Sequence, residues 1–466
     1  MELGVRSTGA CYVPFAVGSV LAPAILSLLL VSFGAHAQSL QESMLSAYRF
    51  NPGLKAERAR LEATNQGIPK ARARFLPTVT GSYSAEYEEY KDRSGNGDYD
   101  QVDHIFQVNL SQPIFQGFSA VNRLNQSHEE STAGYNRLLN REQDLLFGTA
   151  QAYLAVVRDR AVLAHQRRYR SIVAQEHAAV RGRYSLGDAT RTDIEQAAAR
   201  LADAEATLEQ VAGNLDISKA QYQRLVGTAP GKVAWPKIPK HLIPPSVAQA
   251  IDVAYANNPD IRSRIAGARA ARYAARASAG DLLPNVSLES SYQKGYRDNI
   301  TNAREDEFRV GFRISAPLFT GGSNLANVRE AKNIAAQREY ELDDTRLAIR
   351  ESVVRASRQR TAASARAKAS RRSIAANSGA LKGLQIEYRG GQRTLLDVLN
   401  GQRELVDSRI AFEQARYDSM LAEFFLIASI GSLAPEHFSI AAERPAEIAR
   451  LVPEFNDWDL RLAPRN

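Results

Sequence analysis

The side chains best suited to ionic and hydrogen-bonding chemistry lie in two short segments of this 466-residue sequence, Tyr184–Asp193 and Tyr388–Asn400. In each segment a tyrosine is followed by a glycine, a threonine and an aspartate at the same spacing. Such residues can form charged hydrogen bonds, but Gly, Thr and Asp are also common in helix turns and caps. For Gly187 and Gly391 we favour the turn interpretation.

Enzymatic chemistry has no candidate site in this sequence. The seven histidines are not placed at metal-ligand spacing, and the sequence contains neither a phosphate-binding glycine loop nor a nucleophile elbow. The single cysteine, Cys11, lies in an N-terminal segment that we expect to be removed. We therefore predict a protein that is not an enzyme and needs no cofactor or metal. Any ATP hydrolysis would then belong to a partner protein.

Composition excludes a bundle of lipid-embedded helices. The mean hydropathy is −0.33, and past residue 40 no apolar run approaches the roughly 20 residues that a spanning helix needs. The formal net charge is +8, but Lys and Arg alternate with Asp and Glu along whole segments. This alternation favours solvated helix faces over a nucleic-acid surface, so we expect no nucleic-acid partner.

Residues 1–37 have the features of a secretory signal peptide. Arg6 supplies a short positive region, Val17–Phe33 is apolar, and Ala35-His36-Ala37 fits a cleavage site flanked by small residues. A retained membrane anchor is the alternative. We predict that the mature chain begins at Gln38, is exported, and contains no cysteine.

The remainder of the chain is a tandem repeat. Asn51-Pro52 recurs as Asn258-Pro259, 207 residues later (51 to 258), and Pro113 recurs as Pro317, 204 residues later (113 to 317). Matching blocks occur in the same order over both halves, which excludes chance. The change of three residues between the two offsets indicates one difference in loop length.

The repeat predicts the division of the whole chain. The expected parts are a signal peptide at 1–37, repeat one at 38–231, a proline-rich linker at 232–245, repeat two at 246–433, and a C-terminal segment at 434–466. Repeat one should hold strands at about 78–113 and helices at about 119–226. Repeat two should hold strands at about 285–317 and helices at about 322–431.

Each repeat contains two segments in which apolar and polar residues alternate, as in strands with one apolar face. Examples are Val79, Tyr83 and Tyr87 in repeat one, and Phe308 and Phe312 in repeat two. Four strands are too few to close a barrel, and a lipid-facing sheet must close because hydrocarbon cannot satisfy free edges. We therefore expect strands to be pooled across subunits. A soluble sandwich would need more strands than this chain has.

Two long helices joined by a tight turn follow each strand pair. In repeat one we expect them at about 122–184 and 190–226. Apolar and small residues in the second recur at alternating steps of three and four, which predicts a left-handed coiled coil; they are Leu201, Ala204, Leu208, Val211, Leu215, Ser218, Tyr222 and Leu225. The lengths also predict that two shorter helices stack beside one long helix.

A proline and a glycine separate each second strand from the long helix that follows. They are Pro113 and Gly117 in repeat one, and Pro317 and Gly321 in repeat two. We expect the proline to end the strand ladder because it lacks a donor. The glycine would then allow the backbone angles of a sharp change in direction. We name these two segments the strand-to-helix swivels.

This arrangement, and above all the segment Tyr388–Asn400, resembles the TolC family of outer-membrane efflux and secretion ducts. The resemblance covers about residues 39–433. It implies an α+β membrane protein and a homotrimer. A twelve-stranded β-barrel shared by three copies would lie in outer-membrane lipid, and an α-helical tunnel would cross the periplasm.

The resemblance also implies partners. The helix-hairpin tips would engage a periplasmic adaptor, or membrane fusion protein, and an inner-membrane transporter that is either an ABC protein or proton-driven. The chain would then be the exit duct of a tripartite efflux pump or a type I protein secretion system. A periplasmic or surface coiled-coil scaffold or adhesin without channel activity is the alternative. Such a scaffold would share the heptads but not the paired lipid-facing hairpins.

The same resemblance assigns gate roles to residues of the two tip segments. A closing latch would join a pair in the first segment to a pair in the second, namely Thr192 and Asp193 to Tyr388 and Arg393. Asp397 matches the first of two acidic positions that ring the tunnel entrance. Asn400 replaces the acidic residue that is frequent at the second position.

Overall fold

A computed structural model of the chain describes residues 39–91, 99–298 and 304–438. The predicted signal peptide, and all but the first residues of the predicted C-terminal segment, lie outside these ranges. The described helices, in chain order, are α1 Leu40–Phe50, α2 Pro52–Asn65, α3 Gly67–Arg72, α4 Ser119–Ser185, α5 Arg191–Val226, α6 Val247–Asn257, α7 Pro259–Gly280, α8 Ser323–Arg389 and α9 Leu395–Ser429. The described strands are β1 Thr78–Tyr90, β2 Tyr99–Gln116, β3 Asn285–Asp298 and β4 Arg304–Ser315. Short 3-10 turns cover Ala73–Phe75, Lys240–Leu242 and Pro435–Phe438.

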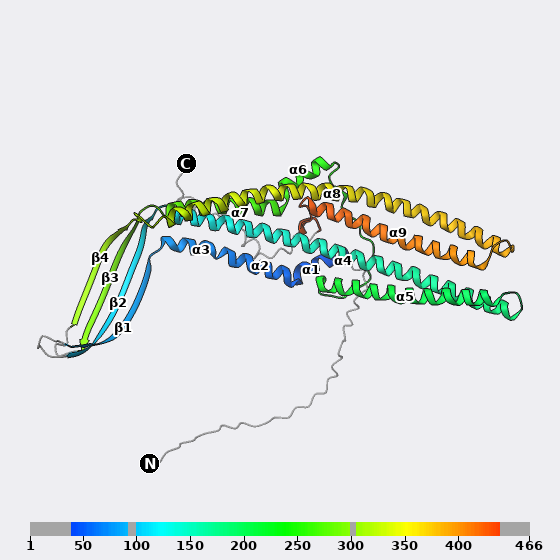
Figure 1. The fold of residues 1–466 in the computed structure, drawn as a ribbon, viewed down its shortest axis with the longest axis horizontal. Coiled ribbons are helices and arrows are strands. Elements are labelled where there is room, and N and C mark those ends of the chain that lie inside the picture. The colour runs from blue at the N-terminus through cyan, green and yellow to red at the C-terminus, as the bar shows by residue number, and fades with distance from the viewer. Residues whose placement is uncertain (1–38, 92–98, 299–303, 439–466) are drawn as a thin grey trace, which may run out of the picture. The chain divides into compact units, whose positions relative to one another are not determined.

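The four strands form one antiparallel sheet in the order β1-β2-β3-β4, so β1 and β4 are its edges (Figure 1). Tyr83 lies opposite Phe106 in the first pair, and Tyr292 opposite Phe308 in the third. Directly opposed residues project to the same side of a sheet. The register therefore collects the apolar residues of both hairpins on one face.

No part of the described chain covers this apolar face. The exposed fractions are 66% for Tyr83, 70% for Phe308, 73% for Phe312 and 72% for Ile314. Large apolar side chains in a contiguous exposed patch mark a surface that another apolar phase or partner covers.

The prediction that proline ends the ladder is wrong for Pro113. β2 continues to Gln116, and Pro113 lies opposite Ser287 of β3. The ladder with β1 ends at the pair Thr78–Ser111, so Pro113 has a neighbouring strand on one side only, and a register shift follows between Pro113 and Phe115. A one-sided position beside a bulge is a place where a strand tolerates proline. In repeat two, β4 ends at Ser315, before Pro317.

The helices are grouped around two long ones of 67 residues each, α4 and α8. α2, α3 and α5 lie beside α4, while α7 and α9 lie beside α8 (Figure 1). Shorter helices thus stack along each long one, two along α8 and three along α4, where the single helix expected before β1 is divided into α2 and α3. α7 and α9 also contact α4, so helices of the second repeat join the two halves.

The largest apolar core lies where α1, the middle of α4, the end of α5 and the end of α9 meet. Tyr48, Tyr153 and Phe424 are at most 2% exposed there. Two hydrogen-bonded pairs lie in this core: the Tyr48 hydroxyl donates to Glu142 at 2.8 Å, and the Ser43 and Tyr222 hydroxyls lie 2.7 Å apart. Close packing of these large buried side chains holds α1, α4, α5 and α9 in fixed positions relative to one another.

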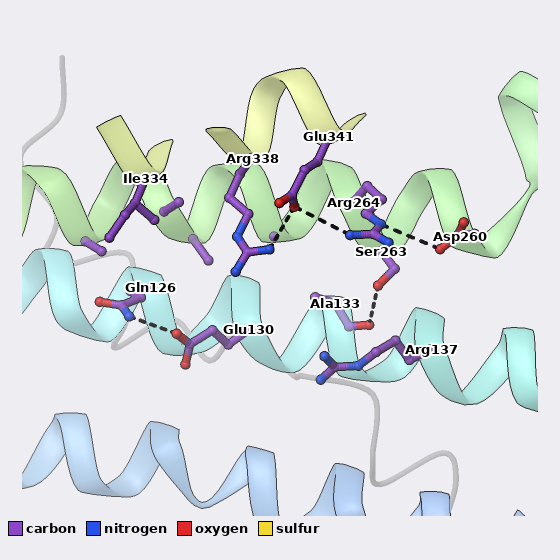
Figure 2. Close-up of a pocket in the computed structure, with 14 residues that line it drawn as sticks. Gln126, Glu130, Ala133, Arg137, Asp260, Ser263, Arg264, Ile334, Arg338 and Glu341 are labelled. Carbon is purple, nitrogen blue, oxygen red and sulfur yellow. Dashed lines mark hydrogen bonds and ion pairs between the residues drawn. The ribbon is translucent and has the colours of Figure 1, made fainter. Parts of the chain in front are cut away.

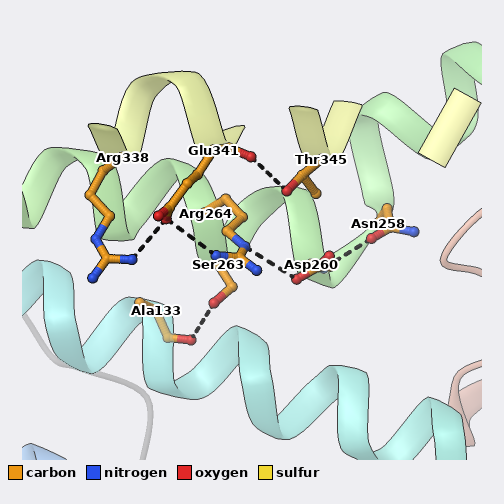
Figure 3. Close-up of polar contacts among 8 residues, drawn as sticks. All are labelled: Ala133, Asn258, Asp260, Ser263, Arg264, Arg338, Glu341 and Thr345. Atoms are coloured by element: carbon orange, nitrogen blue, oxygen red, sulfur yellow. Dashed lines mark hydrogen bonds and ion pairs between the residues drawn. The ribbon is translucent and has the colours of Figure 1, made fainter. Parts of the chain in front are cut away.

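A groove of about 540 Å³ that contains several charged side chains lies between α4, α7 and α8 (Figure 2). Glu341 of α8 accepts a hydrogen bond from Arg338 at 2.8 Å and lies 3.6 Å from Arg264 of α7. The Ser263 hydroxyl donates to the Ala133 carbonyl of α4 at 3.0 Å (Figure 3). The Arg338 hydrogen bond is the main reason that the pKa of Glu341 is lowered. These contacts tie α7 to both long helices.

Within the described ranges, no helix combines the length and apolar character needed to cross a membrane.

Candidate functional site

The two predicted gate segments form the turns α4–α5 and α8–α9, and these turns lie together. A small apolar cluster holds them: Val180 of α4, Ala197 of α5, and Leu395 and Leu399 of α9 are each at most 5% exposed. Tyr388 packs against this cluster. The four helix ends therefore define one tip, with the polar gate candidates around a small core.

Both turns end in the same capping box. The backbone N–H of Thr190 donates to Asp193 Oδ2 at 2.9 Å, and that of Thr394 donates to Asp397 Oδ2 at 3.0 Å. These hydrogen bonds, more than any other cause, hold the pKa of each carboxyl below its ordinary value. Both aspartates therefore remain ionised at neutral pH, and the carboxylate half of each capping box weakens only as acid protonates the carboxylate, while the threonine hydroxyl still accepts from the aspartate N–H.

The glycines of these turns adopt the conformation that the turn interpretation requires. Gly187 has φ +86° and Gly391 has φ +74°. A Cβ at either position would meet nothing within 4 Å, so backbone conformation rather than crowding favours glycine.

Within the described part of the single chain, Thr192 and Asp193 form no hydrogen bond or ion pair with their predicted latch partners Tyr388 and Arg393. Arg393 forms an ion pair with Glu387 of its own hairpin at 2.9 Å. Thr192 is exposed at the first turn of α5. Tyr388 does reach the other hairpin, where its hydroxyl accepts a hydrogen bond from Arg183 and its ring centroid lies 5.5 Å from that guanidinium. Arg183 also contributes to lowering the pKa of Asp193.

Two residues that sequence reasoning missed, Arg183 and Arg200, contact the second hairpin. Arg200 donates to Asn400 Oδ1 at 2.8 Å. Arg183 directly precedes the predicted segment Tyr184–Asp193, and Arg200 lies seven residues after its end. Both are therefore within two helical turns of that segment. Helical periodicity could have indicated Arg200, but no pattern in the sequence identifies its partner.

The two swivels differ in their surroundings. Gly117 and Phe118 have φ of +57° and +66°, and Gly321 and Gly322 have φ of +62° and +88°. The second positive-φ position of each swivel was not predicted, and Phe118 adopts it without being glycine. Gly117 also crosses Gly280 at the end of α7 so closely that a Cβ on it would lie 2.1 Å from the Gly280 carbonyl oxygen.

We expect Gly117→Ala to destabilise the protein far more than Gly321→Ala. Both substitutions place a side chain at positive φ, which costs about 1–2 kcal/mol. Only Gly117→Ala also collides with backbone, because a Cβ on Gly321 would meet nothing within 4 Å. The yield of folded protein and its thermal midpoint, compared between the two variants, measure the difference. Equal loss in both variants would show that the crossing with Gly280 is unimportant.

No group of acidic, histidine or cysteine side chains that could hold a metal ion occurs among the described residues.

Comparison with known proteins places the chain among outer-membrane transport proteins. The sequence profile of the family described as outer membrane efflux protein matches residues 46–228 and again residues 250–432. The outer membrane efflux protein BepC of Brucella suis is 30% identical over 93% of this chain and 95% of its own length. The alkaline protease secretion protein AprF of Pseudomonas aeruginosa is 25% identical, over 85% of each chain.

Solved structures show the same fold. The CmeC outer membrane channel of Campylobacter jejuni superposes with a TM-score of 0.78 over 90% of both chains, at 15% identity. A crystal structure of CusC superposes with a TM-score of 0.75, covering 85% of this chain and 92% of that one.

Proposed function

We propose that this chain, which belongs to the outer membrane efflux protein family, forms one third of a gated duct that crosses the outer membrane and extends through the periplasm. The protein is an outer-membrane protein of the efflux and type I secretion class. Membership in a family of transport channels, rather than enzymes, agrees with the absence of catalytic motifs from the sequence.

The observation that carries the proposal is the sheet. Its apolar face is exposed in the single chain, with Phe312 73% exposed, and its edges β1 and β4 have no neighbouring strand among the described residues. Lipid can cover such a face only if both edges are paired, since hydrocarbon offers no hydrogen bonds. Three copies that pair β4 of one with β1 of the next close a twelve-stranded barrel. A coiled-coil scaffold or adhesin has no need of this face.

The helices would continue the barrel as a tunnel into the periplasm, closed at the tips. We propose that a periplasmic adaptor and an inner-membrane transporter act there, as in a tripartite pump or a type I secretion system. The cargo is either small compounds or a secreted protein.

In the proposed closed gate, Asp193, Arg183 and Tyr388 hold the two hairpins of one chain together. Tyr388 accepts from Arg183, which in turn lies near Asp193. Arg393 points to Glu387 in the single chain and would turn to Thr192 and Asp193 only where copies meet. Hydrogen bonds to charged groups contribute about 1.5–3 kcal/mol each when shielded.

The gate is tested by Arg393→Ser combined with Tyr388→Phe. We expect a higher single-channel conductance in planar lipid bilayers than for the wild type, because the tips separate. Arg389→Ser is the matched control, since Arg389 is exposed in the same turn and should leave conductance unchanged. An unaltered conductance in the double variant would remove Tyr388 and Arg393 from the latch.

A further inference from the structure

α5 and α8 carry stretches of opposite charge at the same distance from the tip. Residues 352–386 of α8 contain eight Lys and Arg and no Asp or Glu. Residues 201–218 of α5 contain four Asp and Glu and no Lys or Arg. Stretches of opposite sign at the same height on two helices that lie at opposite sides of the chain require an explanation beyond solubility.

The basic stretch of α8 and the acidic stretch of α5 lie at similar distances from the common tip, as a count of residues along each helix shows. Tyr388 of α8 and Arg183 of α4 are in contact there, so the ends Arg389 of α8 and Arg191 of α5 lie at about the same level. Glu209 is 18 residues from Arg191 (191 to 209), and Arg371 is 18 residues from Arg389 (371 to 389). At 1.5 Å per residue both side chains lie about 27 Å from the tip.

Both helices present their free sides outward. α5 lies beside α4, α4 beside α9, and α9 beside α8, which places α5 and α8 at the two margins of this layer (Figure 1). The sheet has the same order, with β1 at one margin and β4 at the other. A neighbour that pairs β1 of one copy with β4 of the next therefore also sets α5 of one copy against α8 of the next.

The charges that would meet are unpaired in the single chain. Glu209, Arg371 and Arg372 are exposed and form no ion pair within the described part of the chain. Other members of the two stretches are already paired, such as Glu205 with Arg170 at 2.5 Å and Arg366 with Asp418 at 3.5 Å.

An apolar stripe leads into the basic stretch. Tyr340, Leu347 and Val354 recur every seven residues on α8 and are 76%, 64% and 37% exposed. Two further steps of seven reach Lys368, which therefore lies on the face of the stripe. Arg371 and Arg372, three and four residues further on, lie within about 60° of it around the helix. A partner that covers this face has to offer both apolar contact and negative charge.

We propose that α5 and α8 of adjacent copies form a charged seam in the tunnel wall, in which Glu209 of one copy pairs with Arg371 and Arg372 of the next. The proposal rests on the trimer of the proposed function and identifies the surfaces that meet in it. The occupant is a second copy of this chain, because the complementary charge lies at matching height on the margin that the sheet order already brings together.

The seam is tested by combining Glu209→Cys with Arg372→Cys in the full chain, where the one native cysteine lies in the predicted signal peptide. We expect oxidation to link copies into dimers and trimers on a non-reducing gel. Glu209→Cys with Ser373→Cys is the control, because Ser373 is exposed one residue further on and about 100° around the helix. The control pair should give a several-fold lower yield of disulfide-linked dimers and trimers.

A charge exchange supplies a second readout. Glu209→Arg should lower the fraction of trimer that survives mild detergent by several-fold, and Arg371→Glu with Arg372→Glu in the same chain should restore it. Intact trimers without the disulfide, or without rescue, would overturn the seam and leave the trimer standing. Absence of trimers in every variant and in the wild type would overturn both the seam and the trimer of the proposed function. Linkage of Arg372→Cys to a different protein would assign the basic face to an acidic partner instead.

Discussion

Replacing Phe312 by arginine is expected to prevent insertion of the protein into the outer membrane. Phe312 lies on the apolar face of β4 and is 73% exposed in the single chain. An arginine that faces lipid near the middle of the bilayer costs about 2–4 kcal/mol. In a trimer this cost arises three times, so the variant should be found in the periplasm or as aggregate.

The neighbouring residue provides the control. Arg313 projects to the opposite face of the strand and forms an ion pair with Glu289 of β3 at 2.7 Å. Arg313→Gln should therefore insert normally. Fractionation of membranes, with heat-modifiable migration of the outer-membrane fraction, measures both variants. Normal insertion of Phe312→Arg would mean that the apolar face does not contact lipid.

Removal of the Asp397 charge is expected to abolish a preference for cations. If Asp397 lines the entrance of the proposed trimer, three carboxylates converge there and attract cations, as acidic rings do in cation channels. The hydrogen bonds from Thr394 lower the pKa of Asp397, so the ring stays charged at neutral pH and loses its charge only in acid. Reversal potentials across a salt gradient should show selectivity in the wild type and none in Asp397→Asn.

The capping role of Asp397 requires its own control. Asp397→Asn alters the cap as well as the charge, whereas Thr394→Ala removes the hydroxyl that donates to Asp397 at 2.8 Å and keeps the carboxylate. Thr394→Ala should therefore retain selectivity. If Asp397→Asn leaves the reversal potential unchanged, Asp397 is a cap residue only.

The contact of Asn400 modifies the expectation for a second ring. Asn400 Oδ1 accepts from Arg200, so an aspartate at position 400 would be neutralised by that guanidinium. Asn400→Asp should strengthen block by multivalent cations mainly when it is combined with Arg200→Gln.

Much of the fold follows from local sequence signals. Thr190 and Thr394 are the N-caps that start α5 and α9, and Gly227 in left-handed conformation ends α5. Ala204, Leu215, Ser218 and Tyr222, which belong to the predicted coiled-coil seam, are buried. Such signals depend on residues within one or two turns, and the sequence displays them directly.

Contacts between the two repeats could not be predicted in this way. The crossing of Gly117 with Gly280, and the approach of Arg183 to Tyr388, join residues more than 150 positions apart. The prediction that Pro113 ends its strand was wrong because a strand accepts proline where one neighbouring strand is missing. That depends on where β1 stops, which is not encoded next to Pro113. The partners that Tyr388 and Asn400 find on the other hairpin are likewise set by packing between segments, whereas the cap partners of Asp193 and Asp397 are local.

The mass of the purified outer-membrane protein in mild detergent tests the central claim most directly. The part of each chain that the structure describes contributes four strands with two open edges, so a single copy cannot close a barrel. Native mass spectrometry should therefore find three chains per particle and no membrane-inserted monomer. A stable monomer that inserts into lipid and conducts ions would contradict the shared barrel.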